Sequence, residues 1–131
     1  PFNFQHFSLR ALSVYLDGQQ IGIKPIALDY ANGQYVTSYM SLFNGTGKDN
    51  RDEGNDIDRQ DYANGYALYA FDLSPDLTDS ESFSLARQGT VRVDLTFGEA
   101  LASTVTVVAY AEFENIIEID RNRNVVFDFN N

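Results

Sequence analysis

The sequence predicts an all-β fold: an antiparallel sandwich that carries one short helix and a long acidic loop. Two segments, Thr90–Phe97 and Thr104–Phe113, alternate apolar and polar side chains with the period of a half-buried strand. About seven short segments of this kind follow one another between turn signals, without a strand-helix-strand rhythm. That order is typical of antiparallel sandwiches and barrels and not of parallel sheets.

The first strand is predicted over Leu9–Leu16, whose even-numbered apolar side chains share one face. Asp17-Gly18 follows as a hairpin signal, so the chain is expected to return as a second strand over Gln19–Ile23. Pro25 then ends central pairing, because proline lacks the amide donor that a sheet ladder needs.

One segment has helical spacing. Tyr35–Phe43 places two tyrosines four residues apart, and Asn44-Gly45 supplies a stop signal. The stretch Asn44–Asn64 has six acidic and three basic side chains, too polar for a core, and is predicted to be a long loop. Strands are then expected over Gly65–Leu73, Thr90–Phe97, Thr104–Phe113, Asn115–Ile119 and Asn124–Phe129.

The composition fits one globular domain. The chain has 131 residues, 44% of them hydrophobic, and no cysteine, so its core is expected to need neither a disulfide nor a metal. Nineteen acidic against nine basic side chains give a formal charge of −10, which opposes direct binding to nucleic acid. No apolar run reaches the roughly 20 residues of a bilayer crossing, so no membrane insertion is expected. The absence of a signal-peptide pattern favours assembly inside the cell.

The acidic stretch does not match an EF-hand, although Gly54 lies at the sixth position of a loop that would begin at Asp49. Arg51 stands where an oxygen ligand is needed, and Gln60 replaces the terminal glutamate. We therefore predict a solvated loop and no metal site. Weak calcium binding by this loop is the alternative.

The residue inventory also argues against catalysis. His6 is the sole histidine, which excludes multi-histidine metal centres and cysteine–histidine pairs, and nothing marks an oxyanion hole. The turn Asp120–Asn124 is expected to be held by side chains that bond their own backbone, with its arginines paired to carboxylates; phosphate binding is the alternative. We predict no catalytic residue and no cofactor, so the protein is not expected to be an enzyme. A lectin-like carbohydrate-binding sandwich is the runner-up function.

Four segments together carry a resemblance. They are PFNFQHF (Pro1–Phe7), SVYLDGQQI (Ser13–Ile21), GYALYAFDLSPDL (Gly65–Leu77) and VVAYAEFENIIEIDRNRNV (Val107–Val125). In this order they resemble the C-terminal jelly roll of double jelly-roll major capsid proteins, the hexon-like proteins of Polinton/Maverick elements, adintoviruses and the large DNA virus lineage. The resemblance spans nearly the whole chain.

The resemblance implies a structural protein in which three polypeptides, each with two jelly rolls, form a pseudo-hexagonal capsomer of an icosahedral shell. Residues 1–131 would be a single jelly-roll domain. Because the sequence starts at Pro1 without a methionine, we expect a piece of a longer chain with another jelly roll upstream. The implied partners are copies of the same protein, as a trimer, and other capsid proteins, and the implied location is the virion, assembled inside the host cell. The family has no catalytic residues to carry over.

Tyrosines and phenylalanines number eighteen, more than one sandwich core readily encloses, so some are expected at an interface. The candidates are Tyr30, Tyr35, Tyr39 and Tyr62, which flank or lie in the irregular region and not on the alternating strands. Packing of that region onto its own sandwich is the alternative.

Overall fold

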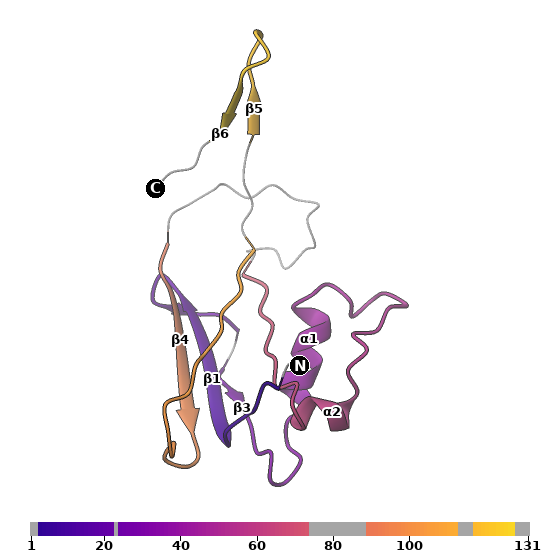
Figure 1. The fold of residues 1–131 in the computed structure, drawn as a ribbon, viewed down its shortest axis with the longest axis vertical. Coiled ribbons are helices and arrows are strands. Elements are labelled where there is room, and N and C mark those ends of the chain that lie inside the picture. The colour runs from indigo at the N-terminus through magenta and orange to yellow at the C-terminus, as the bar shows by residue number, and fades with distance from the viewer. Residues whose placement is uncertain (1–2, 23, 74–88, 113–116, 128–131) are drawn as a thin grey trace.

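The computed structural model describes residues 3–22, 24–73, 89–112 and 117–127. These residues form an antiparallel four-stranded sheet, two short helices beside it, and a two-stranded hairpin (Figure 1). The all-β class predicted from the sequence is confirmed. The strands are β1 (Leu9–Leu16), β2 (Gln19–Gln20), β3 (Ile26–Ala27), β4 (Val91–Phe97), β5 (Ile117–Ile119) and β6 (Val125–Phe127), and the helices are α1 (Val36–Asn44) and α2 (Arg59–Ala63).

Strand β1 is the centre of the sheet. Strand β4 pairs with it antiparallel, from Leu16 opposite Val91 to Leu9 opposite Phe97, and the register shifts between Leu9 and Ala11 as at a β-bulge. Strands β2 and β3 pair antiparallel with the two ends of β1. Since β4 occupies one edge of β1 along its length, β2 and β3 share the other edge (Figure 1). The strand predicted from alternation therefore contributes to every ladder of this sheet.

The turn between β1 and β2 is the one that the sequence predicts. Asp17 and Gly18 have φ values of 52° and 81°, as a type I′ hairpin turn requires. The Asp17 carboxylate accepts a hydrogen bond from the Thr90 N–H at 2.8 Å, and the Asp17 N–H donates to the Thr90 carbonyl at 3.0 Å. The turn thereby fixes the start of β4.

Strand β2 is shorter than the predicted Gln19–Ile23. The paired residues end at Gln20, although the Ile21 N–H still donates to the Val14 carbonyl at 2.8 Å, and Gly22 has a φ of 81°, outside the extended region. Ile23 lies outside the described residues.

Two predicted strands are extended without being paired. Residues 66–73 and 104–112 belong to no ladder, apart from an isolated bridge between Phe4 and Tyr66. The prediction of strands over Gly65–Leu73 and Thr104–Phe113 is therefore wrong for the described residues. Alternation predicts a half-buried face, but it does not supply a neighbouring strand to accept the backbone hydrogen bonds. Phe113, the first two residues of Asn115–Ile119 and residues 128–129 of Asn124–Phe129 lie outside the described part.

The acidic stretch is not one uninterrupted loop, because helix α2 lies within it. Asp58 caps the helix: its carboxylate accepts a hydrogen bond from the Asp61 N–H at 2.6 Å. Only Tyr62 of this helix is buried. A helix of about one and a half turns that buries a single residue is as polar as a loop. Polarity alone therefore led to the wrong prediction of an uninterrupted loop.

The core lies between one face of the sheet and the chain that crosses it. Leu9, Leu12 and Leu28 form its buried centre, and Tyr69 and Phe71 of the unpaired segment pack against them. On β4, Leu95 and Phe97 close the same cluster. This layer joins the sheet to the helical side of the molecule.

The end of helix α1 meets the crossing segment very closely at Gly45. A Cβ atom at Gly45 would lie 2.7 Å from the carbonyl carbon of Ala70, a backbone atom that no side-chain rotation moves away. Its φ of −75° suits any residue, so the cost of Gly45→Ala is steric. We expect this substitution to lower the free energy of unfolding by about 1–3 kcal/mol in urea denaturation, as overpacking does.

Gly54→Ala is the matched control. A Cβ atom there would meet nothing nearer than the Asp56 nitrogen at 3.8 Å. It should leave the midpoint unchanged or raise it slightly, because alanine restricts the unfolded chain. Equal stability of the two variants would contradict the close contact at Gly45.

Candidate functional site

The four tyrosines predicted at an interface lie together around Tyr62, which is 0% exposed. Its hydroxyl donates to the Leu68 carbonyl at 2.9 Å, which ties helix α2 to the segment that crosses the sheet. Its ring centroid lies 5.6–6.5 Å from those of four other tyrosines, from α1, the β3–α1 loop and the crossing segment. The tyrosine cluster consists of Tyr30, Tyr35, Tyr39, Tyr62 and Tyr69.

The expectation that the four candidates lie near the surface is wrong for Tyr62. Tyr30, Tyr35 and Tyr39 are half-buried. The rings pack on one another and on their own domain, which was the alternative drawn from the sequence. A direct contact between a partner and Tyr62 would require the cluster to open, whereas Tyr39 keeps part of its surface accessible. Their role in subunit contacts stays a prediction.

Polar contacts inside the cluster are made by neutral groups. The hydroxyls of Tyr30 and Tyr69 lie 2.8 Å apart in a hydrogen bond. Burial raises the pKa of Tyr69 to about 12 and moves the pKa values of Tyr30 and Tyr62 still further above their ordinary range. These three phenols therefore stay protonated at neutral pH, and the cluster acts as packing and not as an acid–base site.

His6 extends the cluster on one side. Its ring stacks on Tyr30 with centroids 3.9 Å apart and planes 5° apart, and its Nδ1 accepts a hydrogen bond from the Ser8 N–H at 3.0 Å. Burial lowers the pKa of His6. Sequence reasoning left His6 and Tyr69 outside the candidate set, although the FQHF and YALYAF patterns place both among aromatic neighbours.

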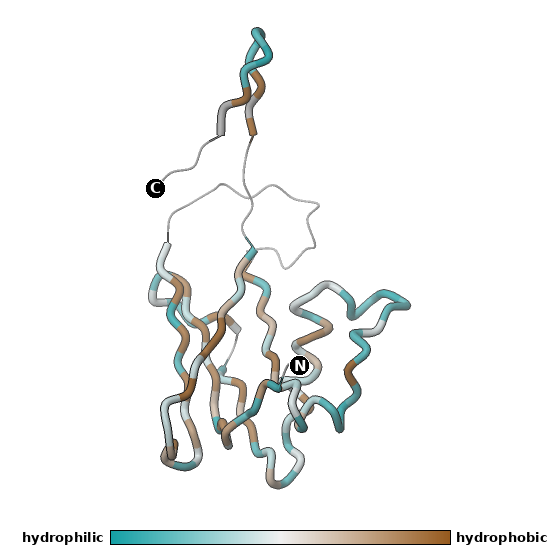
Figure 2. Tube along the Cα trace, in the orientation of Figure 1, coloured by the Kyte–Doolittle hydropathy of each residue, from teal (hydrophilic) through white to brown (hydrophobic). Residues whose placement is uncertain are grey.

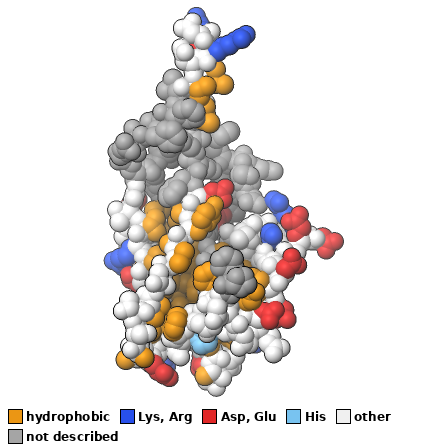
Figure 3. Space-filling model, in the orientation of Figure 1, with side chains coloured by type: hydrophobic (Ala, Val, Ile, Leu, Met, Phe, Trp, Pro, Cys, Tyr) orange, Lys and Arg blue, Asp and Glu red, His pale blue; other side chains and the backbone are white. Residues whose placement is uncertain are grey.

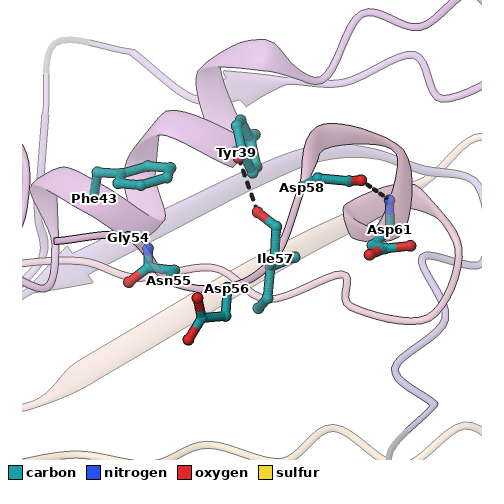
Figure 4. Close-up of a pocket in the computed structure, with 8 residues that line it drawn as sticks. All are labelled: Tyr39, Phe43, Gly54, Asn55, Asp56, Ile57, Asp58 and Asp61. Atoms are coloured by element: carbon teal, nitrogen blue, oxygen red, sulfur yellow. Dashed lines mark hydrogen bonds between the residues drawn. The ribbon is translucent and has the colours of Figure 1, made fainter.

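A hollow of about 450 Å³ opens beside the cluster, between α1 and the chain that leads into α2 (Figure 4). We call it the acidic hollow. Helix α1 contributes Tyr39 and Phe43, whose rings meet edge to face at 5.4 Å. The Tyr39 hydroxyl donates to the Ile57 carbonyl at 2.9 Å and so holds the far wall in place. The lining is Tyr39, Phe43, Gly54, Asn55, Asp56, Ile57, Asp58 and Asp61.

The hollow combines aromatic walls with negative charge. One oxygen of Asp58 is used as the helix cap, whereas the carboxylates of Asp56 and Asp61 have no partner among the described residues. The amide nitrogen of Asn55 is buried without an acceptor. In the described ranges, no three acidic or histidine side chains are close enough to hold a metal ion. Spaced carboxylates beside aromatic rings suit a planar, extended cation such as a guanidinium.

The turn Asp120–Asn124 is confirmed as a turn held by its own side chains. One Asp120 oxygen accepts from the N–H groups of Asn122 at 2.7 Å and Asn124 at 2.8 Å, and the other accepts from the Asn124 amide at 2.8 Å. These hydrogen bonds lower the pKa of Asp120. The expected ion pairs do not form: Arg121 and Arg123 have no partner in the part of the chain that the structure describes. Both carboxylate oxygens of Asp120 thus accept hydrogen bonds from residues of the same turn.

Helices α1 and α2, the helices of the described part, are too short to cross a membrane.

The Tyr30–Tyr69 hydrogen bond should couple the two side chains. Tyr30→Phe or Tyr69→Phe leaves one half-buried hydroxyl without its partner, and each is expected to cost about 1–2 kcal/mol of unfolding free energy. The double variant should cost less than the sum of the singles, because it removes both hydroxyls. Tyr66→Phe, at a side chain 39% exposed, is the control and should change little. Additive costs in urea denaturation would contradict a direct hydrogen bond.

His6 should make stability depend on pH in mild acid. The pKa of His6 in the folded protein is lowered from 6.5, so below about pH 6.5 the unfolded chain binds more protons than the folded one. The free energy of unfolding therefore decreases as the pH is lowered. Above that pH its contribution is fully present. We expect unfolding midpoints to decline from about pH 7 to pH 5 in the wild type and to stay nearly level in His6→Gln. Because His6 is the sole histidine, its proton NMR titration gives the pKa directly, and a value at or above 6.5 would contradict this account.

Comparison with known proteins finds one distant similarity. The chain is 34% identical over 131 residues to an uncharacterized protein of Caenorhabditis elegans. The match covers 98% of this chain but 31% of that protein, so the chain spans about a third of the length of its relative. No family model matches the chain, and no solved structure matches it.

Proposed function

We propose that this chain is a jelly-roll domain of a structural capsid protein, which forms trimeric pseudo-hexagonal capsomers of an icosahedral shell in the virion. The observation that carries the proposal is an extended segment, residues 104–112, whose backbone has no hydrogen-bond partner among the described residues and which exposes apolar side chains. Four sequence segments resemble hexon-like capsid proteins in the same order along the chain, and this resemblance suggests capsid proteins as the partners.

Residues 104–112 run beside the sheet without pairing with it, although Val105 is half-buried. No backbone hydrogen bond joins them to the rest of the described chain. Val107 is 63% exposed, Val108 73% and Tyr110 90%. Because Val107 and Val108 are adjacent and point to opposite faces of an extended chain, the segment is uncovered on both faces from Val107 onward. An apolar strand without backbone partners needs a neighbour to satisfy both its amides and its side chains.

The exposed apolar surface continues onto strand β4. Val91 and Val93 share a face with Leu95, which packs on the core, yet they are 49% and 48% exposed. Figure 3 shows hydrophobic side chains gathered on this side of the body. The apolar face of the sheet thus extends beyond what the described chain covers, as is typical of a domain that packs against further domains or subunits.

The proposed role is structural and involves no catalytic residue, cofactor or metal. The partners are copies of the same polypeptide and other capsid proteins. A formal charge of −10 leaves contacts with the genome to other components of the particle.

Light scattering coupled to size exclusion on the full-length protein tests the proposal. We expect a stable trimer, and particles by electron microscopy where assembly continues. Val108→Asp should weaken association by about tenfold or more without lowering the unfolding midpoint, because it places a charge on an exposed apolar contact. Thr37→Asp, at an exposed residue of helix α1 outside this segment, is the control for added charge.

A strict monomer at high micromolar concentration, with no particles, would contradict the proposal. A monomer that binds oligosaccharides would instead favour a lectin-like sandwich.

A further inference from the structure

The β5–β6 hairpin combines exposed apolar strands with a basic turn at its tip. Ile117, Ile119 and Val125 on its strands are 59%, 69% and 48% exposed. The turn between the strands carries Arg121 and Arg123, whose exposed side chains have no partner within the described ranges of the chain. Figure 2 shows the hydrophilic tip and the hydrophobic strands below it, and Figure 1 shows the hairpin extending away from the sheet.

The tip is preorganised to present its arginines. Three hydrogen bonds from Asn122 and Asn124 converge on the Asp120 carboxylate, and the Asp120 N–H donates to the Asn124 carbonyl at 3.0 Å. None of these bonds uses an arginine side chain. The turn therefore keeps its shape while two guanidinium groups remain available, which reduces the ordering cost of binding.

The acidic hollow is complementary to such a tip. It presents the carboxylates of Asp56 and Asp61, to which no described residue is bound, beside the rings of Tyr39 and Phe43. Arginine binds carboxylates through its planar fork and stacks on aromatic faces, so one guanidinium can use both features of the lining.

The distribution of charge on this chain indicates which molecule supplies the guanidinium. A chain with a formal charge of −10 repels copies of itself, so local opposite charge favours contact between copies. Among the described residues, the arginine side chains of the tip have no partner, and neither do the carboxylates of Asp56 and Asp61 in the hollow. A contact of tip to hollow between copies uses two different surfaces, and such heterologous contacts close into rings when the rotation fits.

We propose that the β5–β6 hairpin of one copy inserts Arg121 or Arg123 into the acidic hollow of a neighbouring copy. This inference rests on the proposed assembly into trimers and names one contact that holds them together. The apolar side chains of the hairpin strands would pack around the aromatic rim of the same hollow.

Sedimentation equilibrium of the full-length protein measures the contact. Arg121→Glu/Arg123→Glu is expected to weaken self-association by about thirtyfold or more, because it replaces attraction by repulsion at the carboxylates. Asp56→Arg/Asp61→Arg should weaken it similarly. Combining all four substitutions in one chain should restore association, since the charges are then exchanged.

Arg10→Glu/Lys24→Glu makes the same change in net charge at exposed residues away from the hairpin and should leave association nearly unchanged. Unfolding midpoints close to wild type verify that each variant folds; where an arginine variant fails this check, Arg121→Gln/Arg123→Gln replaces it.

A wild-type trimer whose dissociation constant is the same after the arginine reversal would overturn this contact and leave the proposed function standing. A wild-type monomer would overturn both. Reversal that changes monomer stability but not association would show that the hairpin binds the hollow of its own chain, which also overturns the inference.

Discussion

The helical side of the molecule depends on the burial of one side chain, Tyr62. Its ring lies at the centre of the tyrosine cluster, and its hydroxyl is satisfied by the Leu68 carbonyl. Helix α2 has five residues, too few to be stable by its own hydrogen bonds. Packing of the Tyr62 ring therefore stabilises helix α2. Helix α2 in turn positions one wall of the acidic hollow.

The same constraint links the hollow to the sheet. Tyr69 contacts Tyr62 on one side and the leucine core of the sheet on the other. Tyr39 joins the cluster through its ring and supports the hollow through its hydroxyl. A change in packing at the cluster would therefore reach both the sheet and the acidic hollow, although the two share no direct hydrogen bond in the described residues.

Local chemistry made part of this fold predictable. The alternation of β1 and β4, the Asp17-Gly18 turn and the helical spacing after Tyr35 depend on neighbours in sequence, and each appears within a residue or two of its predicted bounds. The tyrosine cluster did not follow from the sequence, because residues 30 and 69 meet across 39 positions. Asp58 was a usable cap signal for α2, but the surrounding charges concealed it. Pairing of the strand predicted over Thr104–Phe113 depends on a partner strand, which alternation cannot identify.

The exposed segment 104–112 also affects the tendency of the protein to aggregate. From Thr104 to Ala111 it has no charge and no proline, and it consists largely of residues that favour strands. Such a stretch with unpaired edges pairs as readily with a wrong copy as with the right one. In the proposed assembly, productive association and aggregation would compete for the same surface, and the outcome would depend on which occurs faster. The strong negative charge of the chain slows indiscriminate encounters and favours those in which opposite charges meet first.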